Sequence, residues 1–384
     1  MAGVDFTRAL TAQQEHDLIQ LTAERYPTTP QLEVISANTQ FHVVNRWWQK
    51  DKLSIESGTE YNDLLFFDRD GNAQAGRMLP GQPINRAIHK STAKFSIPYV
   101  KAYGFWEIMH DETARNRMPS QLKSIVIPRR MKMQIDLAKQ LEEDGFGSPD
   151  SAADRVKPFG LKYWAKPITA AQAALDTQDH QGSLPLYSDN TTEAASCAGV
   201  VCSHADYALF RNYNARYFHD NIIDDFGEED VLRIVRMHRH MEFEVPLIVD
   251  DWKAGKFSNY TGLVPEDLLE TMEVMARKNN DNLQADLGKF SGQVVVKGTP
   301  LRWAKKLDTD WFQAGTALPS YPFILLNHDY FKVLIQQGEY FRTDEPMRDA
   351  DTPDVWTNYT FCVYNYVITN RRLGVGVISV EPKS

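Results

Sequence analysis

The chain has 384 residues, and its 42 lysines and arginines against 51 aspartates and glutamates give it a formal charge of −9 at pH 7. This acidic balance argues against a dedicated nucleic-acid-binding protein, because such proteins carry a basic patch or stripe. The sequence has no apolar window of about 18 residues and no signal-peptide pattern at its start, so we expect neither a membrane span nor secretion. Three cysteines without metal-type spacing indicate reduced thiols in a cytoplasmic setting; they are Cys197, Cys202 and Cys362.

The first 98 residues divide into a polar arm and a region of short β-type runs. Residues Thr11–Tyr26 predict a short helix, which the stretch Pro27–Pro30 ends. The runs FHVVNRWWQ, LSIES, DLLFFD and KFSIPYV, between Phe41 and Val100, are typical of strands separated by polar turns. The segment RDGNAQAGRMLPGQPINR between them has little apolar content, so a hairpin there must lie on a partner or stay mobile.

The most regular segment of the sequence runs from Pro119 to Asp144. Apolar residues recur there at helical spacing and Ser120 can cap the first turn, so we predict one long helix. Pro128 lies inside this segment and should kink the helix or divide it. The glycine-bearing stretch Gly145–Ser151 predicts its end. The apolar stripe consists of Leu122, Val126, Met133, Leu137 and Leu141.

The remainder of the chain mixes helices and strands. Helices are predicted at Glu228–His240 and at Pro265–Lys278, the second with proline in its first turn. The runs GQVVVKGTPLRWA and YPFILLN predict strands, as does the long run from Trp356 to the end. No tandem repeat or low-complexity tract is present. The fold class predicted from this order is α+β.

Two adjacent arginines, Arg371 and Arg372, interrupt the apolar terminal run YNYVITNRRLGVGVISV. Strand alternation would place them on opposite faces, so that each can reach a partner. Charge-assisted bonds to a carboxylate would then orient this part of the chain. The alternative is a terminal strand whose arginines are solvated.

Few residues suggest chemistry. His238, His240 and Glu242 would share one face of a strand, where a metal could bind. The flanking sequence favours a helix, in which positions two apart point about 200° away from each other. Asp68–Asn72 resembles the start of a calcium loop, but its glycine is fourth instead of sixth, which favours a hairpin turn. No common nucleophile, metal-hydrolase or nucleotide-binding motif occurs, so we expect no enzymatic activity and no cofactor.

Five stretches in a fixed order resemble the major capsid protein of tailed bacteriophages, which has the Hong Kong 97 fold shared with encapsulins and herpesvirus capsid floors. They span much of the chain, although each is a loose match by itself. The stretches are AGVVCSHADYALFRNYNARY, YTGLVPEDLLETMEVMARKNNDNLQADLG, VVVKGTPLRWAKKLDTD, YPFILLNHDYFKVLIQQGEYF and NYVITNRRLGVGVIS.

The resemblance implies a division of the chain into the parts of that fold. In chain order these are an N-terminal arm (1–40), an extended E-loop (41–98), a peripheral domain with a spine helix (99–150), an axial domain (151–335), a return to the peripheral domain (336–371) and a final strand of the axial domain (372–384).

The function implied is a structural subunit that assembles as hexamers and pentamers into an icosahedral shell around the double-stranded DNA of a tailed phage. Implied partners are other copies of the chain, a separate scaffolding protein, a portal, a cement or decoration protein, and packaged DNA in weak contact. The implied location is the virion, with assembly in the host cytoplasm. Two alternatives remain open, an encapsulin-type shell and a soluble metal-dependent enzyme that uses His238, His240 and Glu242.

The resemblance also suggests which residues join subunits or domains. Trp47 and Trp48 would face opposite sides of a strand, so that one anchors the E-loop in its own subunit and the other meets a neighbour; a core-only role is the alternative. The full set of candidate contact residues is Trp47, Trp48, Arg69, Arg77, Arg371 and Arg372.

Overall fold

The computed structural model describes most of the chain from residue 41 to residue 380, with gaps. The described residues are 41–50, 52–55, 58–66, 92–115, 119–150, 154–165, 180–181, 196–201, 210–219, 222–242, 259–278, 294–308, 321–348, 352 and 354–380. The helix predicted at Thr11–Tyr26 and the weakly apolar hairpin segment between Phe66 and Thr92 lie outside these residues.

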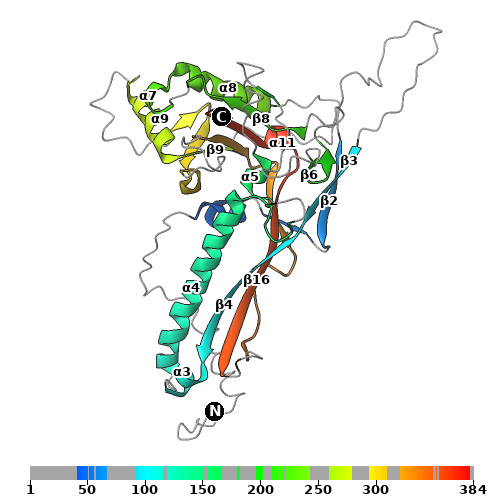
Figure 1. The fold of residues 1–384 in the computed structure, drawn as a ribbon, viewed down its shortest axis with the longest axis vertical. Helices are drawn as coiled ribbons and strands as arrows, with labels where there is room; N and C mark the ends of the chain where they lie inside the picture. The colour runs from blue at the N-terminus through cyan, green and yellow to red at the C-terminus, as the bar shows by residue number, and fades with distance from the viewer. Residues whose placement is uncertain are drawn as a thin grey trace, which may run out of the picture.

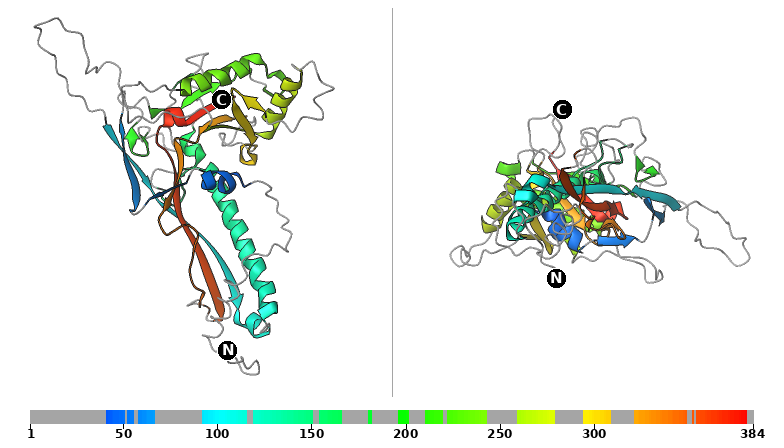
Figure 2. Two further views of the ribbon diagram at one scale, coloured as in Figure 1. Left: turned by 180° about the vertical axis from the view of Figure 1, so that it is seen from behind. Right: turned by 90° about the horizontal axis from the view of Figure 1, so that it is seen from below.

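The molecule is elongated, with a different sheet at each end (Figure 1). At one end, the long helix α4 (Pro119–Phe146) runs beside strands β4 (Val100–Met109) and β16 (Val355–Ile368). At the other end, helices α8 (Glu228–Met241) and α9 (Glu266–Lys278) lie over a second sheet. Figure 2 shows the same two parts from behind and from below. The predicted α+β class is therefore confirmed.

The elongated end is built on a six-stranded sheet in which β16 is central. On one side β16 pairs antiparallel with β4, from Val355 opposite Met109 to Tyr364 opposite Val100. On its other side β16 pairs with three strands, and a fourth strand lies parallel to the longest of them. These are β13 (Phe331–Gln336), β14 (Arg342–Thr343), β15 (Met347–Arg348) and, beside β13, β1 (Lys52–Ile55).

Helix α4 packs on one face of β4, because alternate residues of the strand turn toward it. The buried apolar side chains of α4 that the structure describes include Val126, Met133, Leu137, Leu141 and Phe146. Gly104 makes the close approach possible, since a Cβ atom there would lie 3.0 Å from Cγ of Met133. The predicted long helix is confirmed, and it continues through Pro128 without division. Val126 before the proline and Met133 after it are both buried against the sheet, which holds the two halves together.

The other end is built on a seven-stranded sheet with the order β10-β11-β9-β12-β17-β8-β5. Alternate residues of its central strand enter different cores: Phe323 and Leu325 face helices α8 and α9, whereas Ile324 and Leu326 join the core shared with the six-stranded sheet. The strands are β5 (His180–Gln181), β8 (Tyr213–Arg216), β9 (Tyr260–Val264), β10 (Val295–Val296), β11 (Thr299–Trp303), β12 (Phe323–Asn327) and β17 (Val375–Ser379).

The long terminal run predicted as one strand is divided between the two sheets. Strand β16 ends at Ile368, a short helix α11 (Arg371–Gly374) follows, and β17 begins at Val375. The side chain of Asn370 accepts a hydrogen bond from the backbone N–H of Leu373 at 3.4 Å, which starts the helical turn. The prediction that strand alternation separates the two arginines is therefore wrong, because both lie in this turn.

The run FHVVNRWWQ is helical and not a strand. It forms a π-helical segment η1 (Val43–Trp47) followed by the short helix α2 (Trp48–Lys50). Its β-branched and aromatic residues suggested a strand, but a carboxylate from α4 binds the free N–H groups at its start, and packing decides the local structure.

A two-stranded hairpin base leaves the junction of the two sheets. Strands β2 (Glu60–Phe66) and β3 (Thr92–Pro98) pair antiparallel along their whole length. Ser96 also donates its N–H to the carbonyl of Ala198 at 2.9 Å, which ties β3 to the small β6–β7 pair. The remaining short elements are α3 (His110–Arg115), α5 (Leu161–Trp164), β6 (Ser196–Cys197), β7 (Val200–Val201), α7 (Ile222–Asp225) and η4 (Lys305–Leu307).

Candidate assembly interface

An aromatic strip, which consists of Tyr103, Phe105, Tyr359 and Phe361, covers the face of β4 and β16 that turns away from α4, and Met109 lies farther along the same face beyond the exposed Glu107. Tyr103, Phe105 and Met109 are 58%, 49% and 58% exposed, although all three are large and largely apolar. Tyr103 lies opposite Phe361 and Phe105 lies opposite Tyr359 in the strand register. The ring centroids are 6.5 Å apart along β4, 5.9 Å apart along β16 and 6.3 Å apart between Phe105 and Tyr359. Contiguous exposed apolar surface of this kind marks sites of protein–protein contact.

Cations lie on the rings at one end of the aromatic strip. The Lys101 ammonium is 3.8 Å from the ring centroid of Phe361, and the Arg342 guanidinium is 5.9 Å from the same centroid. Arg342 is also paired with Asp344 at 3.2 Å and with Glu339. A partner that binds this strip therefore meets apolar rings with a nearby ammonium group, that of Lys101, for which the described residues show no ion pair.

An ion pair fixes the far end of β4 against α4. Arg129 donates from Nη1 to Oε2 of Glu112 at 2.6 Å and from Nη2 to Oε1 of Glu112 at 2.5 Å. Its Nη1 also donates to the Glu107 carbonyl at 2.7 Å. Glu112 in turn accepts the N–H of Met109 at 3.2 Å. The bonds from Arg129 hold the pKa of Glu112 below its ordinary value. The strand that carries the aromatic strip is thus linked to the helix behind it by an ion pair and a backbone hydrogen bond.

Trp47 and Trp48 are both buried inside their own subunit. The Trp47 ring lies 5.2 Å from Phe146 at the end of α4 and 4.9 Å from Phe331 on β13. Trp48 donates its indole N–H to the Tyr366 hydroxyl at 3.2 Å. Because the segment is helical, the expected placement of the two rings on opposite faces of a strand is wrong, and both rings fill the core where η1, α4 and the six-stranded sheet meet.

Glu142 joins the same region to α4. Its carboxylate, almost completely buried, accepts the N–H of His42 at 3.0 Å and that of Val43 at 2.7 Å. Burial outweighs these two bonds and raises the pKa of Glu142 to about 7. Burial lowers the pKa of the neighbouring His42 imidazole to about 4, and the charge of Arg46 lowers it further. The chain therefore enters its first described helix through a buried carboxylate that titrates near neutral pH.

Arg371 lies completely buried between the ends of the two sheets. Its Nε donates to the carbonyl of Trp164 at 2.7 Å, and Nη2 donates to the side-chain oxygen of Asn212 at 2.6 Å. The expected carboxylate is not among these contacts, so the neutral carbonyl and amide oxygens orient the junction instead. The solvated alternative is also wrong for Arg371. Arg372 is half-buried in the same turn, and Arg69 and Arg77 lie outside the described residues.

The histidine cluster does not form a metal site in the described part of the chain. His238 is buried within α8, whereas His240 lies on the exposed side and stacks on Tyr213 with centroids 5.2 Å apart. Glu242 follows the helix and pairs with Lys297. Burial lowers the pKa of His238 to about 4. The described residues contain no group of three metal-binding side chains, and no helix among them is long and apolar enough to cross a membrane.

Neither the aromatic strip nor Glu142 is among the contact residues predicted from the sequence. The strip has a readable signal, since KAYGFWEIM alternates between two faces that both carry apolar residues, whereas a half-exposed strand should alternate apolar and polar residues. Glu142 has no comparable signal, because its partners are backbone groups about 100 residues earlier in the chain.

Comparison with known proteins finds similar folds among capsids. No protein-family model matches the sequence, and no curated protein matches it either. The capsid of a native GTA particle, a structure computed with C5 symmetry, is 11% identical, with 93% of this chain and 95% of that chain covered and a TM-score of 0.53. The capsid asymmetric unit of cyanophage A-1(L) is 11% identical, with 95% and 99% covered and a TM-score of 0.57. The chain therefore has the fold of these capsid subunits, as its resemblance to phage capsid proteins led us to expect.

Proposed function

We propose that this protein is a major capsid protein, the structural subunit that assembles as hexamers and pentamers into an icosahedral shell around the double-stranded DNA genome of a tailed phage. The observation that carries this proposal is the agreement of fold over more than nine-tenths of the chain with two capsid subunits, each of which is covered almost completely. Because the match covers nearly all of both chains, it supports a shared role for the whole subunit.

The subunit's surfaces support this role. The aromatic strip is exposed on a sheet that α4 covers on its other face, and such a surface suits lateral contact with a neighbouring copy. We propose that the chain is divided as the resemblance implies, with an arm (1–40), an E-loop (41–98) and a peripheral domain (99–150, with its return at 336–371) that reach neighbouring copies. The axial domain, 151–335 with the final strand at 372–384, then surrounds the rotation axis of each ring.

The proposed partners follow from a closed container. They are further copies of the chain, a separate scaffolding protein, a portal, and a cement or decoration protein on the outside. The net charge of −9 supports only weak, non-specific contact with packaged DNA. The proposed role is structural and not catalytic, and the proposed place is the virion capsid after assembly in the host cytoplasm.

The two rival functions have less support. The similar structures are capsids of a GTA particle and of a cyanophage, which favours a capsid over an encapsulin-type compartment. A metal-dependent enzyme would need His238 and His240 on one face, but one is buried and the other is exposed on the same helix.

Sedimentation velocity of the purified full-length chain, alone and with a co-expressed scaffolding protein, tests the proposal. We expect species far heavier than the 43.9 kDa subunit, and discrete rings among the smaller species. A chain that stays monomeric or dimeric in both preparations would contradict the proposal. A stoichiometric metal ion in such a small species, measured by elemental analysis, would favour the enzyme instead.

A further inference from the structure

The outer surface of α8, together with the adjoining α7, carries charge in an ordered pattern. Side chains three and four residues apart share one face of a helix, and the opposite face of α8 is buried against the seven-stranded sheet. Acidic groups gather at one end, basic groups at the other, and Leu232, 55% exposed, lies between them. We call this surface the bipolar face; it consists of Asp224, Asp225, Glu228, Glu229, Leu232, Arg236, Arg239 and His240.

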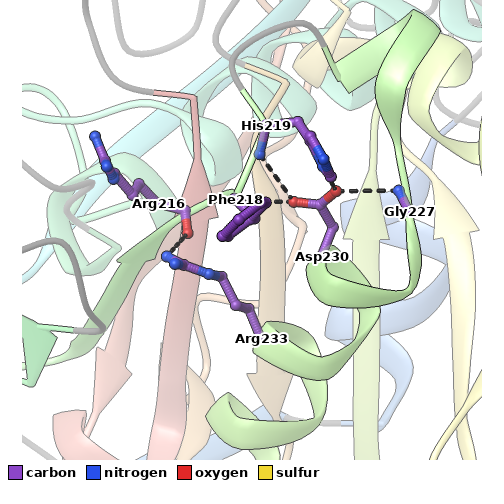
Figure 3. A network of polar contacts seen from close by, with 6 residues as sticks. All are labelled: Arg216, Phe218, His219, Gly227, Asp230 and Arg233. Atoms are coloured by element: carbon purple, nitrogen blue, oxygen red, sulfur yellow. Dashed lines mark hydrogen bonds and ion pairs between the residues drawn. The ribbon is translucent and has the colours of Figure 1, made fainter.

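The acidic end of the bipolar face is held in a fixed shape (Figure 3). The buried Asp230 carboxylate accepts the backbone N–H groups of Phe218 at 2.7 Å, His219 at 3.3 Å and Gly227 at 3.1 Å. It also contacts Nδ1 of His219 at 2.7 Å. One turn later, Arg233 donates to the last carbonyl of β8 at 2.8 Å. Because these contacts tie the start of α8 to the sheet, little conformational freedom is left to lose when the face binds a partner.

The helix dipole explains only part of this pattern. A dipole favours acidic residues in the first turn of a helix and basic residues in the last. It does not account for Leu232, a large apolar side chain exposed between the two charged groups. Within the part of the chain that the structure describes, Arg236 and Arg239 also have no carboxylate partner. The subunit thus presents two complementary charged ends with an exposed apolar side chain between them.

We propose that the bipolar face binds a second copy of this chain, with the acidic end of one copy against the basic end of the next. The acidic end and the basic end are two different patches of one chain, so a head-to-tail repeat pairs both ends of every copy, whereas an antiparallel contact of the two faces would close as a pair of copies and form no ring. Contacts that use two different patches of the same chain close into rings when the rotation between copies allows it. This inference rests on the proposed function, for which it names the contact that builds hexamers and pentamers.

Charge reversal tests the pairing directly. One variant carries Arg236→Glu and Arg239→Glu, a second carries Glu228→Arg and Glu229→Arg, and a third combines all four changes. A matched control reverses two exposed acidic residues at the start of α9, Asp267→Lys and Glu270→Lys, which lie outside the bipolar face. The readout is the protein concentration at which light scattering and electron microscopy first detect rings or shells.

We expect each half-reversed variant to raise this threshold at least about tenfold, which corresponds to about 1.4 kcal/mol. The combined variant should return toward the wild-type threshold, and the α9 control should remain there. Because reversed charges oppose the helix dipole, circular dichroism and thermal unfolding of each variant must show a folded subunit. A milder pair, Arg236→Gln and Arg239→Gln, should assemble with less sensitivity to NaCl than the wild type, since it lacks the screened contact.

The possible failures are distinguishable. Folded half-reversed variants that assemble at the wild-type threshold would overturn the contact. If the half-reversed variants do not assemble at the wild-type threshold, and the combined variant is folded but does not assemble there either, the acid-to-base pairing is overturned. An unchanged NaCl dependence in the glutamine pair would overturn it too. A wild-type chain that never assembles would instead overturn the proposed function, and the ring contact with it.

Discussion

Replacement of Glu142 by glutamine tests whether one buried carboxylate sets much of the pH dependence of this subunit's stability. The side chain accepts two backbone N–H groups at the start of η1 and is almost completely buried. Glutamine keeps the shape and an acceptor oxygen but cannot ionise. The variant therefore isolates the effect of the charge.

The magnitude follows from the pKa of Glu142, which rises from 4.5 to about 7 in the folded chain. The folded state thus binds this proton more tightly than the unfolded state. The resulting stability is fully present below pH 4.5 and is lost as the pH rises through about 7. A difference of about 2.5 pKa units corresponds to about 3 kcal/mol. We expect the free energy of unfolding of the variant, relative to wild type, to rise by about this amount between pH 4.5 and about pH 8.

Urea denaturation of the disassembled subunit, followed by tryptophan fluorescence at several pH values, measures this difference. Burial also raises the pKa of Asp144, but that effect is common to both proteins and cancels. Glu143→Gln is the matched control, because its side chain is 69% exposed and pairs with Lys306 at 3.1 Å; its effect should stay below about 1 kcal/mol. A difference between Glu142→Gln and wild type that is flat with pH, or that falls as the pH rises, would refute the reasoning.

Three further substitutions have defined outcomes. Arg371→Lys keeps the charge but loses the guanidinium geometry that donates to two partners at once. Thermal unfolding should therefore show a loss of about 3 kcal/mol in the free energy of unfolding, against about 1 kcal/mol for Arg372→Lys at the half-buried neighbouring position. Equal losses would contradict the structure. Gly160→Ala would place a Cβ atom 2.6 and 2.8 Å from two backbone carbonyl oxygens at the end of α4 and still closer to a third, so the soluble yield should collapse, and a normal yield would count against this packing. Tyr103→Ser with Phe105→Ser should lower the unfolding midpoint of the subunit only modestly but raise the assembly threshold at least about tenfold, because about half of each ring is exposed in the subunit. A large fall in the midpoint with normal assembly would place the rings in the core instead.

The regular elements could be predicted because their patterns are local. Helix α4 follows from an apolar stripe, and α9 follows from a proline at its start and helical spacing after it. The strands β12 and β16 follow from β-branched and aromatic runs. These elements bury a continuous face, so the pattern and the tertiary structure agree.

The irregular elements could not be predicted because distant groups decide them. The run at η1 has the composition of a strand, but the Glu142 carboxylate accepts hydrogen bonds from its first N–H groups. The ring of Trp47 also packs against Phe146 and Phe331. The turn at α11 depends on the Asn370 cap and on partners for Arg371 that lie 159 and 207 residues away in the chain. A single sequence carries no signal for contacts of that range.

For the candidate contact residues, too, the sequence shows some features and only the folded structure shows others. The tryptophans and Arg371 were recognised as unusual from their local context, but that context could not tell a core position from a surface one. The exposure of the aromatic strip depends on which face of β4 packs against α4. The close contact between Gly104 and Met133 determines that face, and this contact is visible only in the folded structure.

Negative-stain electron microscopy of the purified full-length chain, with and without a scaffolding protein, tests the central claim most directly. We expect closed shells, or sheets and tubes of hexamers, in at least one of the two preparations. A homogeneous population of small particles in both preparations, with no rings and no curved lattice, would contradict the proposed role as a shell subunit.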